Sequence, residues 1–201
     1  MKFRQCSKAV AAMIGLSALA VSMSGCVAGQ SIGLRHAAGS VPEFTSGKTV
    51  SVESRDSREF IVNGDKDPSY LGHLRAGYGN TWGVKNAGGL ALAEQFKNDL
   101  VAEMAAQGIQ TASAGDRRLF VDILDWNFDA YQNGRVWYDL AVSVSDSAGK
   151  ILASIKIKDE KVVRGSVMMG AAGAMKREVP AIYSDVIKEI LGNRDIQKAL
   201  K

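Results

Sequence analysis

The sequence predicts an α+β fold, a largely antiparallel sheet with two main helices packed on one face. Apolar and polar residues alternate in three consecutive segments between residues 117 and 163, and short turn sequences separate these segments. Two other segments, around 87–107 and 180–191, repeat apolar residues at the spacing of an amphipathic helix. Because consecutive hairpins make neighbouring strands antiparallel, we expect a single domain of this kind over residues 48–201.

The first part of this domain has short strand patterns. Residues 48–54 alternate, with Val50 and Val52 on one face, which predicts a strand. Residues 58–63 predict a second short strand, because a turn-rich sequence follows their apolar run.

Two segments carry the apolar stripe of a helix. In residues 87–107 the stripe recurs every four positions, and Gly108 follows as a natural helix end. Its members are Leu92, Phe96, Leu100 and Met104. Pro180 is expected to open or kink the last helix, which Gly192 ends. The stripe of that helix consists of Ile182, Val186 and Ile190.

The meander between these helices is predicted from alternation and turn residues. Residues 117–131 and 136–144 each place large apolar side chains on one face, and Asn133-Gly134 between them is a strong hairpin signal. A third strand is expected over residues 151–163. This order of strands is what predicts the antiparallel character of the sheet.

Composition excludes several classes of protein. With 46% hydrophobic and 23% charged residues in 201, the chain is not intrinsically disordered. Two cysteines and two histidines exclude cysteine-rich zinc sites and disulfide scaffolds. Residues 1–25 hold three of the 25 basic residues and no acidic one, so the remainder carries 22 basic against 21 acidic residues. A nucleic-acid partner is therefore not expected.

The N-terminus has the features of a secretory signal peptide. Lys2, Arg4 and Lys8 precede an apolar run over 9–21, which is shorter than a membrane-spanning helix requires. Ser24-Gly25-Cys26 then resembles the lipobox of bacterial lipoproteins, although Met23 stands where the family usually has leucine. The resemblance implies that Cys26 is acylated, for example with palmitate, and becomes the first residue of the mature protein. An uncleaved anchor and a plain signal peptide remain the alternatives.

The lipobox resemblance also implies a domain organisation and a location. Residues 1–25 are the expected signal peptide, and 26–47 the expected lipidated cysteine with a flexible tether. Val27 follows the cysteine, whereas the enterobacterial signal for retention in the inner membrane is an aspartate. By this resemblance the protein is expected to be lipid-anchored in the outer membrane and to face the periplasm.

A glycine-rich stretch is a candidate contact surface. Residues 69–89 are expected to form a long ordered loop that includes the aromatic residues Tyr78 and Trp82. Residues 77–83 have the spacing GxGxxxG, which does not fit a dinucleotide-binding fingerprint, and no P-loop lysine is present. Two interpretations stay open: the two aromatic rings pack the loop, or they contact a protein partner.

Four aspartates lie on two adjacent predicted strands, where paired carboxylates can bind cations or transfer protons. Alternation places Asp122 on one face and Asp125 and Asp129 on the other, so the set does not converge. With Asp139 they are expected to be solvated charges opposed by lysines. Those lysines are Lys156 and Lys158.

No catalytic, metal or cofactor site is expected. His36 lies in the predicted tether and His73 in the glycine-rich loop, so His73 alone is available for a serine-histidine-acid triad. No serine has the GxSxG context of a nucleophile elbow. The sequence therefore favours a protein that is not an enzyme and that needs no cofactor.

The lipobox, the tether and the order of elements together resemble the YajG-type family of bacterial lipoproteins, over 48–52, 92–108, 117–163 and 182–200. The resemblance implies a membrane-anchored envelope lipoprotein, a binding or accessory module for transport or assembly with an envelope protein as partner. It supplies no catalytic residues. The alternative is a lipid-anchored periplasmic hydrolase or a polysaccharide-binding enzyme.

Overall fold

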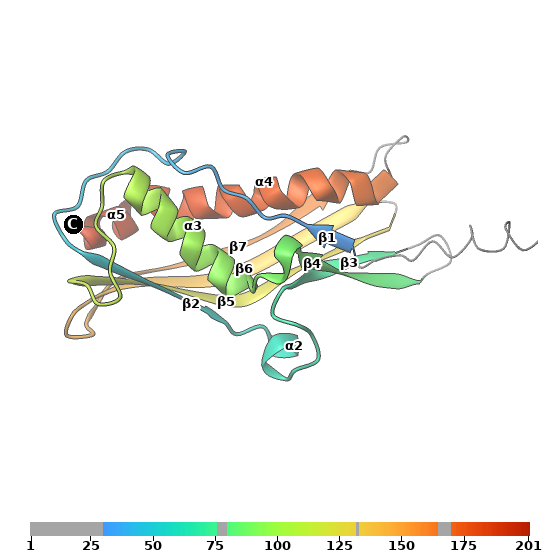
Figure 1. Ribbon diagram of the computed structural model, residues 1–201, viewed down its shortest axis with the longest axis horizontal. Helices are drawn as coiled ribbons and strands as arrows, with labels where there is room; N and C mark the ends of the chain where they lie inside the picture. The colour runs from blue at the N-terminus through green and yellow to red at the C-terminus, as the bar shows by residue number, and fades with distance from the viewer. Residues whose placement is uncertain (1–29, 76–79, 132, 165–169) are drawn as a thin grey trace, which may run out of the picture.

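The computed structural model describes residues 30–75, 80–131, 133–164 and 170–201 (Figure 1). Seven strands form one mixed sheet in the order β1-β4-β3-β5-β6-β7, with β2 beside β5. The strands are β1 (Gln30–Ile32), β2 (Val50–Asp56), β3 (Tyr70–Arg75), β4 (Thr81–Asn86), β5 (Arg117–Ala130), β6 (Gly134–Asp146) and β7 (Ile151–Val163). The helices are α2 (Glu59–Val62), α3 (Leu92–Ala106), α4 (Gly170–Gly192) and α5 (Arg194–Leu200), with a 3-10 turn η1 (Ala87–Gly89).

The sheet is mostly antiparallel, as the meander predicts, but it also contains parallel pairs. The strands β5, β6 and β7 form two long antiparallel ladders, and β3 and β4 form a hairpin. Parallel pairs join β1 to β4, and both β2 and β3 to β5. The strands β2 and β3 share one edge of β5, because β2 covers its first half and β3 its last residues. The N-terminal half of the chain therefore completes the sheet alongside the meander.

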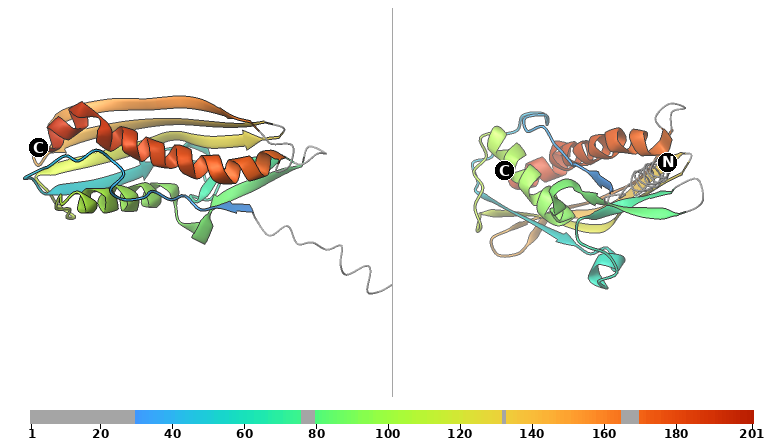
Figure 2. Two further views of the ribbon diagram at one scale, coloured as in Figure 1. Left: turned by 90° about the horizontal axis from the view of Figure 1, so that it is seen from above. Right: turned by 45° about the vertical axis from the view of Figure 1, so that its right-hand side comes forward.

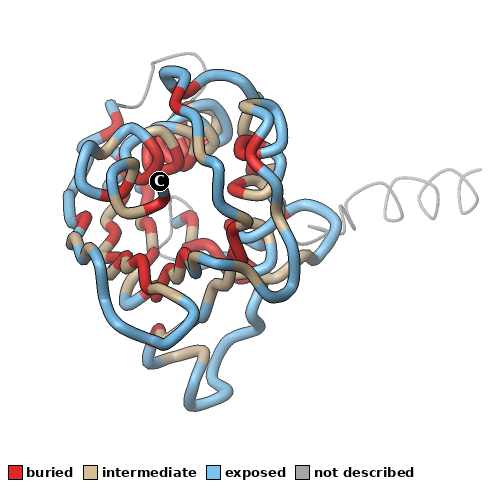
Figure 3. The backbone as a smooth tube through the Cα atoms, turned by 90° about the vertical axis from the view of Figure 1, so that its left-hand side faces the viewer, coloured by how far each residue is buried: buried red, intermediate tan, exposed pale blue. Residues whose placement is uncertain are grey.

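The helices α3, α4 and α5 lie on the same face of the sheet, whereas α2 lies at the opposite face (Figures 1 and 2). Figure 3 shows that both the helices and the sheet contain buried positions. We call the sheet face turned away from α3, α4 and α5 the outer face. Side chains that alternate along β5 and β6 therefore divide between the core and this outer face.

Helix α3 packs as its four-residue spacing predicts. The side chains of Leu92, Phe96, Leu100 and Met104 are all fully buried. The Phe96 ring lies 4.8 Å from that of Tyr183 and 5.9 Å from that of Trp126, so it joins α3 to α4 and to β5. The helix ends where Gly108 adopts a φ of 73°, a left-handed conformation that glycine takes without steric cost.

The last helix begins earlier than the sequence predicts. Pro180 lies inside α4, so of its two expected roles, to open or to kink the last helix, the first is wrong. A proline inside a helix removes one backbone hydrogen bond, but Met175 and Val179 extend the buried stripe on the N-terminal side, and this packing offsets the loss. Asn193 then caps α5, since its side-chain oxygen accepts hydrogen bonds from the backbone nitrogens of Asp195 and Ile196.

Two short-range predictions are wrong. Residues 58–63 contain the helix α2 instead of a strand, because the fully buried Arg58 donates to the carbonyl oxygens of Tyr70 (2.7 Å) and Trp126 (3.1 Å). Those long-range bonds outweigh the local strand pattern. The expected loop at 69–89 instead contains the hairpin of β3 and β4, whose side chains Leu71, Leu74 and Val84 are buried in the core.

The described part of the expected flexible tether is folded. Residues 30–32 form β1, which pairs with β4, and Leu34, Val41 and Phe44 are buried in the core. These apolar side chains are too widely spaced to produce a periodic signal. Residues 30–47 therefore pack on the domain that the sequence places at 48–201. Within the described residues, no helix has the length and hydropathy needed to span a membrane.

Candidate functional site

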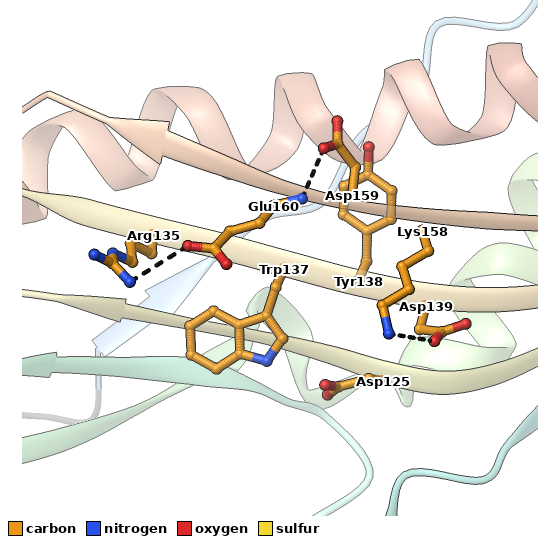
Figure 4. Close-up of a pocket in the computed structure, with 8 residues that line it drawn as sticks. All are labelled: Asp125, Arg135, Trp137, Tyr138, Asp139, Lys158, Asp159 and Glu160. Carbon is orange, nitrogen blue, oxygen red and sulfur yellow. Dashed lines mark hydrogen bonds and ion pairs between the residues drawn. The ribbon is translucent and has the colours of Figure 1, made fainter.

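The outer face of the sheet carries an open hollow of about 510 Å³, which we call the outer hollow (Figure 4). Strands β5, β6 and β7 supply its walls, and the Trp137 ring lies among charged side chains. Its lining on the outer face consists of Asp125, Arg135, Trp137, Asp139, Lys158 and Glu160, and Tyr138 and Asp159 line it from the helix side of β6 and β7. Ligand sites are usually lined mainly by apolar and aromatic side chains with a few polar groups, whereas charged side chains make up most of this lining.

A β-bulge in β5 determines which aspartates reach the outer face. The register shifts between Ile123 and Asp125. Before the shift Val121 and Ile123 face the core, and after it Trp126 and Phe128 do. Asp122, Asp125 and Asp129 consequently share the outer face. The prediction that Asp122 points away from the other two is wrong, because one extra residue reverses the alternation.

Asp125 and Asp139 face each other across β5 and β6. Burial raises the pKa of the Asp125 carboxyl, and the negative charge of Asp139 adds to this, while hydrogen bonds from the Trp126 backbone and the Trp137 side chain oppose it. Asp139 is held differently, since the Nζ atoms of two lysines each lie 3.2 Å from its Oδ2 atom. They are Lys156 and Lys158, the lysines expected to oppose these acids.

The charges around the Trp137 ring are arranged in pairs. The guanidinium of Arg135 lies 3.5 Å from the carboxylate of Glu160, and Lys158 contacts Asp139. The indole nitrogen is directed toward Asp125 (Figure 4). Paired charges present donors and acceptors without a strong field of one sign, which suits a polar ligand without a large net charge.

A second hollow of about 380 Å³ lies beside α2 and the β3–β4 hairpin and includes His73. The His73 Nε2 atom lies 3.3 Å from the Oδ1 atom of Asp129, and its Nδ1 atom lies 3.3 Å from the Tyr70 hydroxyl. Asp129 also binds Arg75, so the pKa of its carboxyl is lowered. His73 is thus held by an acid and a phenol, with no serine hydroxyl among its described hydrogen bonds.

A third cluster of polar side chains was not predicted from the sequence. His36 contacts Ser184 Oγ through Nδ1 (3.0 Å) and Glu103 Oε2 through Nε2 (2.9 Å). The three side chains have the composition of a catalytic triad, but those of His36 and Glu103 are 1% and 0% exposed. Glu103 also accepts hydrogen bonds from the backbone nitrogens of Gly39 and Val41. The group therefore fastens the 33–47 segment to α3 and α4.

The residues predicted as sites divide between described and undescribed regions. Cys26 and Tyr78 lie outside the described residues. Trp82 lies on β4 and is 39% exposed. Across the residues that the structure describes, no group of three or more histidine, cysteine, aspartate or glutamate side chains has the geometry to hold a metal ion.

Known proteins resemble this chain in fold but not in sequence. No family model and no curated protein sequence matches it. A crystal structure from Xanthomonas campestris, assigned to the family model DUF330, is 15% identical, covers 84% of this chain and 95% of its own, and has a TM-score of 0.55. A minor lipoprotein from Acinetobacter baumannii is 9% identical, with coverages of 78% and 94% and a TM-score of 0.43. The likeness to the Xanthomonas structure concerns the fold alone.

Proposed function

We propose that this protein is a lipoprotein of the bacterial envelope, anchored through Cys26 in the outer membrane and facing the periplasm. The observation that carries the proposal is the sequence Ser24-Gly25-Cys26 after a basic start and a short apolar run. Several acyl chains on one cysteine give stable anchoring, whereas a single chain gives marginal binding. The fold shared with the Xanthomonas protein is compatible with this proposal.

Replacement of the cysteine tests the anchor. Cys26→Ala is expected to leave a larger, unprocessed precursor that takes up no labelled fatty acid. The wild type is expected to fractionate with membranes and to be released by detergent. Cys6→Ala is the matched control, because Cys6 lies in the expected signal peptide. Wild-type protein that is soluble in the periplasm with a free Cys26 thiol would rule the anchor out.

The folded domain acts in this proposal as a non-enzymatic binding module for an envelope partner in transport or assembly. Its support is the outer hollow, where Trp137 lies between charge pairs on the outer face of the sheet. Trp137→Ala should keep the far-UV circular dichroism spectrum and lose a partner that is crosslinked in intact cells. Leu152→Ala, an exposed residue outside this hollow, is the control and should keep that partner.

One observation favours a second candidate, a polysaccharide hydrolase. Asp125 has a raised pKa and lies opposite Asp139, which forms ion pairs with two lysines. The two carboxyl groups therefore have different environments, as the general acid and the second carboxylate of a glycosidase do. Release of reducing ends from envelope polysaccharides by the purified protein, abolished in Asp125→Asn, would establish this activity. Equal release by both proteins would exclude Asp125 as the acid.

A further inference from the structure

One end of the sheet is defined by a continuous line of paired residues. Trp82 pairs with Leu74, Leu74 with Ala130, Ala130 with Gly134, and Gly134 with Val163, so five strands reach the same level. We call this the β4-start end. The helix α4 begins at this end as well (Figure 1). The opposite end contains the β6–β7 turn and the C-terminus of the chain.

The described chain enters the domain near the β4-start end. Strand β1 runs parallel to β4, and Gln30 pairs with Val84. The N-terminal end of β1 is therefore directed toward the side of Thr81, the first residue of β4. The direction of β1 alone fixes this side.

The distance from the proposed anchor to the sheet is short. Four steps along the chain join Cys26 to Gln30, which is at most about 14 Å when fully extended. Val84 lies three residues inside β4, or about 10 Å from Thr81. The Cα atom of Cys26 can therefore lie at most about 4 Å beyond the level of Thr81. A longer tether would let the domain turn freely, but here the lipid and the β4-start end stay together.

The same end carries amphipathic side chains. Among the described residues, the exposed large hydrophobic side chains include two aromatic ones, Trp82 (39%) and Tyr131 (48%). Tyr131 follows Ala130, and Val162, which is 64% exposed, precedes Val163, so all three lie within one residue of the line of paired residues. Tryptophan and tyrosine concentrate at membrane surfaces, because their rings have an apolar body and a polar group.

We propose that the β4-start end is a membrane-contact surface, on which Trp82, Tyr131 and Val162 rest at the headgroup level of the bilayer that holds Cys26. The inference rests on the proposed lipid anchor. The strands then stand away from the membrane, and the outer hollow opens to the side, where a partner reaches it. The sequence offers Trp82 as a candidate contact for a protein partner, and in this proposal Trp82 contacts lipid instead.

Site-specific labels in the full-length, lipidated protein test this orientation. Tyr131→Cys and Val162→Cys place a thiol at the β4-start end, and Ile151→Cys places one at the far end of β7, which spans 13 residues, or about 40 Å. All three positions are exposed. Each variant, coupled to nitrobenzoxadiazole, is reconstituted into phosphatidylethanolamine–phosphatidylglycerol vesicles with a headgroup-level spin-labelled lipid. Cys26 does not take the label, because its sulfur carries lipid.

The expected result is strong quenching at positions 131 and 162 and none at 151, because the length of β7 places position 151 about 40 Å from the proposed contact with the headgroups. Vesicle-bound protein with equal quenching at both ends, or stronger quenching at 151, would overturn the orientation and leave the anchor standing. Protein that does not sediment with the vesicles would overturn the anchor, and this inference with it. A Val162 label that behaves like the Tyr131 label excludes a local effect of either substitution.

Discussion

The imidazole of His36 lies 2.9 Å from the carboxylate of Glu103, and both side chains are buried. Burial by itself raises the pKa of Glu103, but hydrogen bonds from Gln107, His36 and the backbone of Val41 and Gly39 more than compensate, so the pKa is lowered. The first described segment of the chain is thus held to α3 by one carboxylate. That contact fixes the position of residues 36–41, which follow the proposed anchor in the sequence, on the domain.

Glu103→Ala should lower the free energy of unfolding by about 3–5 kcal/mol, since it leaves buried donors without an acceptor. Urea denaturation measures the loss. The matched control is Glu94→Ala, an exposed position on the same helix, which should change stability little. An equal effect in both variants would contradict the fastening role of Glu103.

The lowered pKa of Glu103 predicts a pH dependence. A carboxyl whose folded-state pKa is lowered contributes stability above its unfolded pKa, and this contribution is lost as pH falls through the folded-state value. The stability difference between wild type and Glu103→Gln should therefore be largest near neutral pH and shrink in acid. Thermal unfolding at a series of pH values measures this difference. A difference that grows in acid would contradict the prediction.

Phe96→Ala should destabilise the protein by about 3–5 kcal/mol, the range for truncation of a large core side chain. Phe96 is fully buried and contacts the rings of Trp126 and Tyr183. Differential scanning calorimetry should show a clear fall in Tm. Lys97→Ala, exposed at the next position of α3, is the control. An unchanged Tm for Phe96→Ala would contradict the packing of α3 on the sheet.

Asp125→Asn should stabilise the protein near neutral pH by about 0.2–1 kcal/mol, the size of a cross-strand charge effect, because it removes a negative charge that burial disfavours and that Asp139 repels. The pKa of Asp125 is raised in the folded state. The contribution of this carboxyl to stability is therefore fully present below its unfolded-state pKa and is lost as pH rises through its folded-state pKa. The gain should vanish in acid, where both proteins are neutral at this position. Asp65→Asn, at an exposed position, is the control for thermal scans over the same pH series.

Gly72→Ala should cost about 1–3 kcal/mol through overpacking. A Cβ atom at Gly72 would lie 2.5 Å from the Phe128 ring and 2.6 Å from the Phe128 carbonyl oxygen, so β3 and β5 would have to separate. Gly47→Ala meets no atom within 4 Å and serves as the control. Equilibrium unfolding in urea compares the two variants, and equal stability would show that the sheet yields at this point without cost.

Local pattern alone determined several elements. The spacing of Leu92, Phe96, Leu100 and Met104 identifies α3 and its buried face, because a helix brings every fourth side chain to one side. Alternation and the Asn133-Gly134 signal identify the strands of the meander for the same kind of reason. The proposed anchor at Cys26 is also a local signal, since charge, length and small residues within one segment define it.

Tertiary contacts decided the rest. His36 and Glu103 are 67 residues apart in the sequence, and Arg58 and Trp126 are 68 residues apart. Local periodicity carries no information over such sequence separations. The bulge before Asp125 brings the acids to one face by a single added residue, which has no pattern of its own. The sequence determined which segments could bury an apolar face. The sum of long-range packing and buried hydrogen bonds decided which segments pair, and therefore which polar side chains meet.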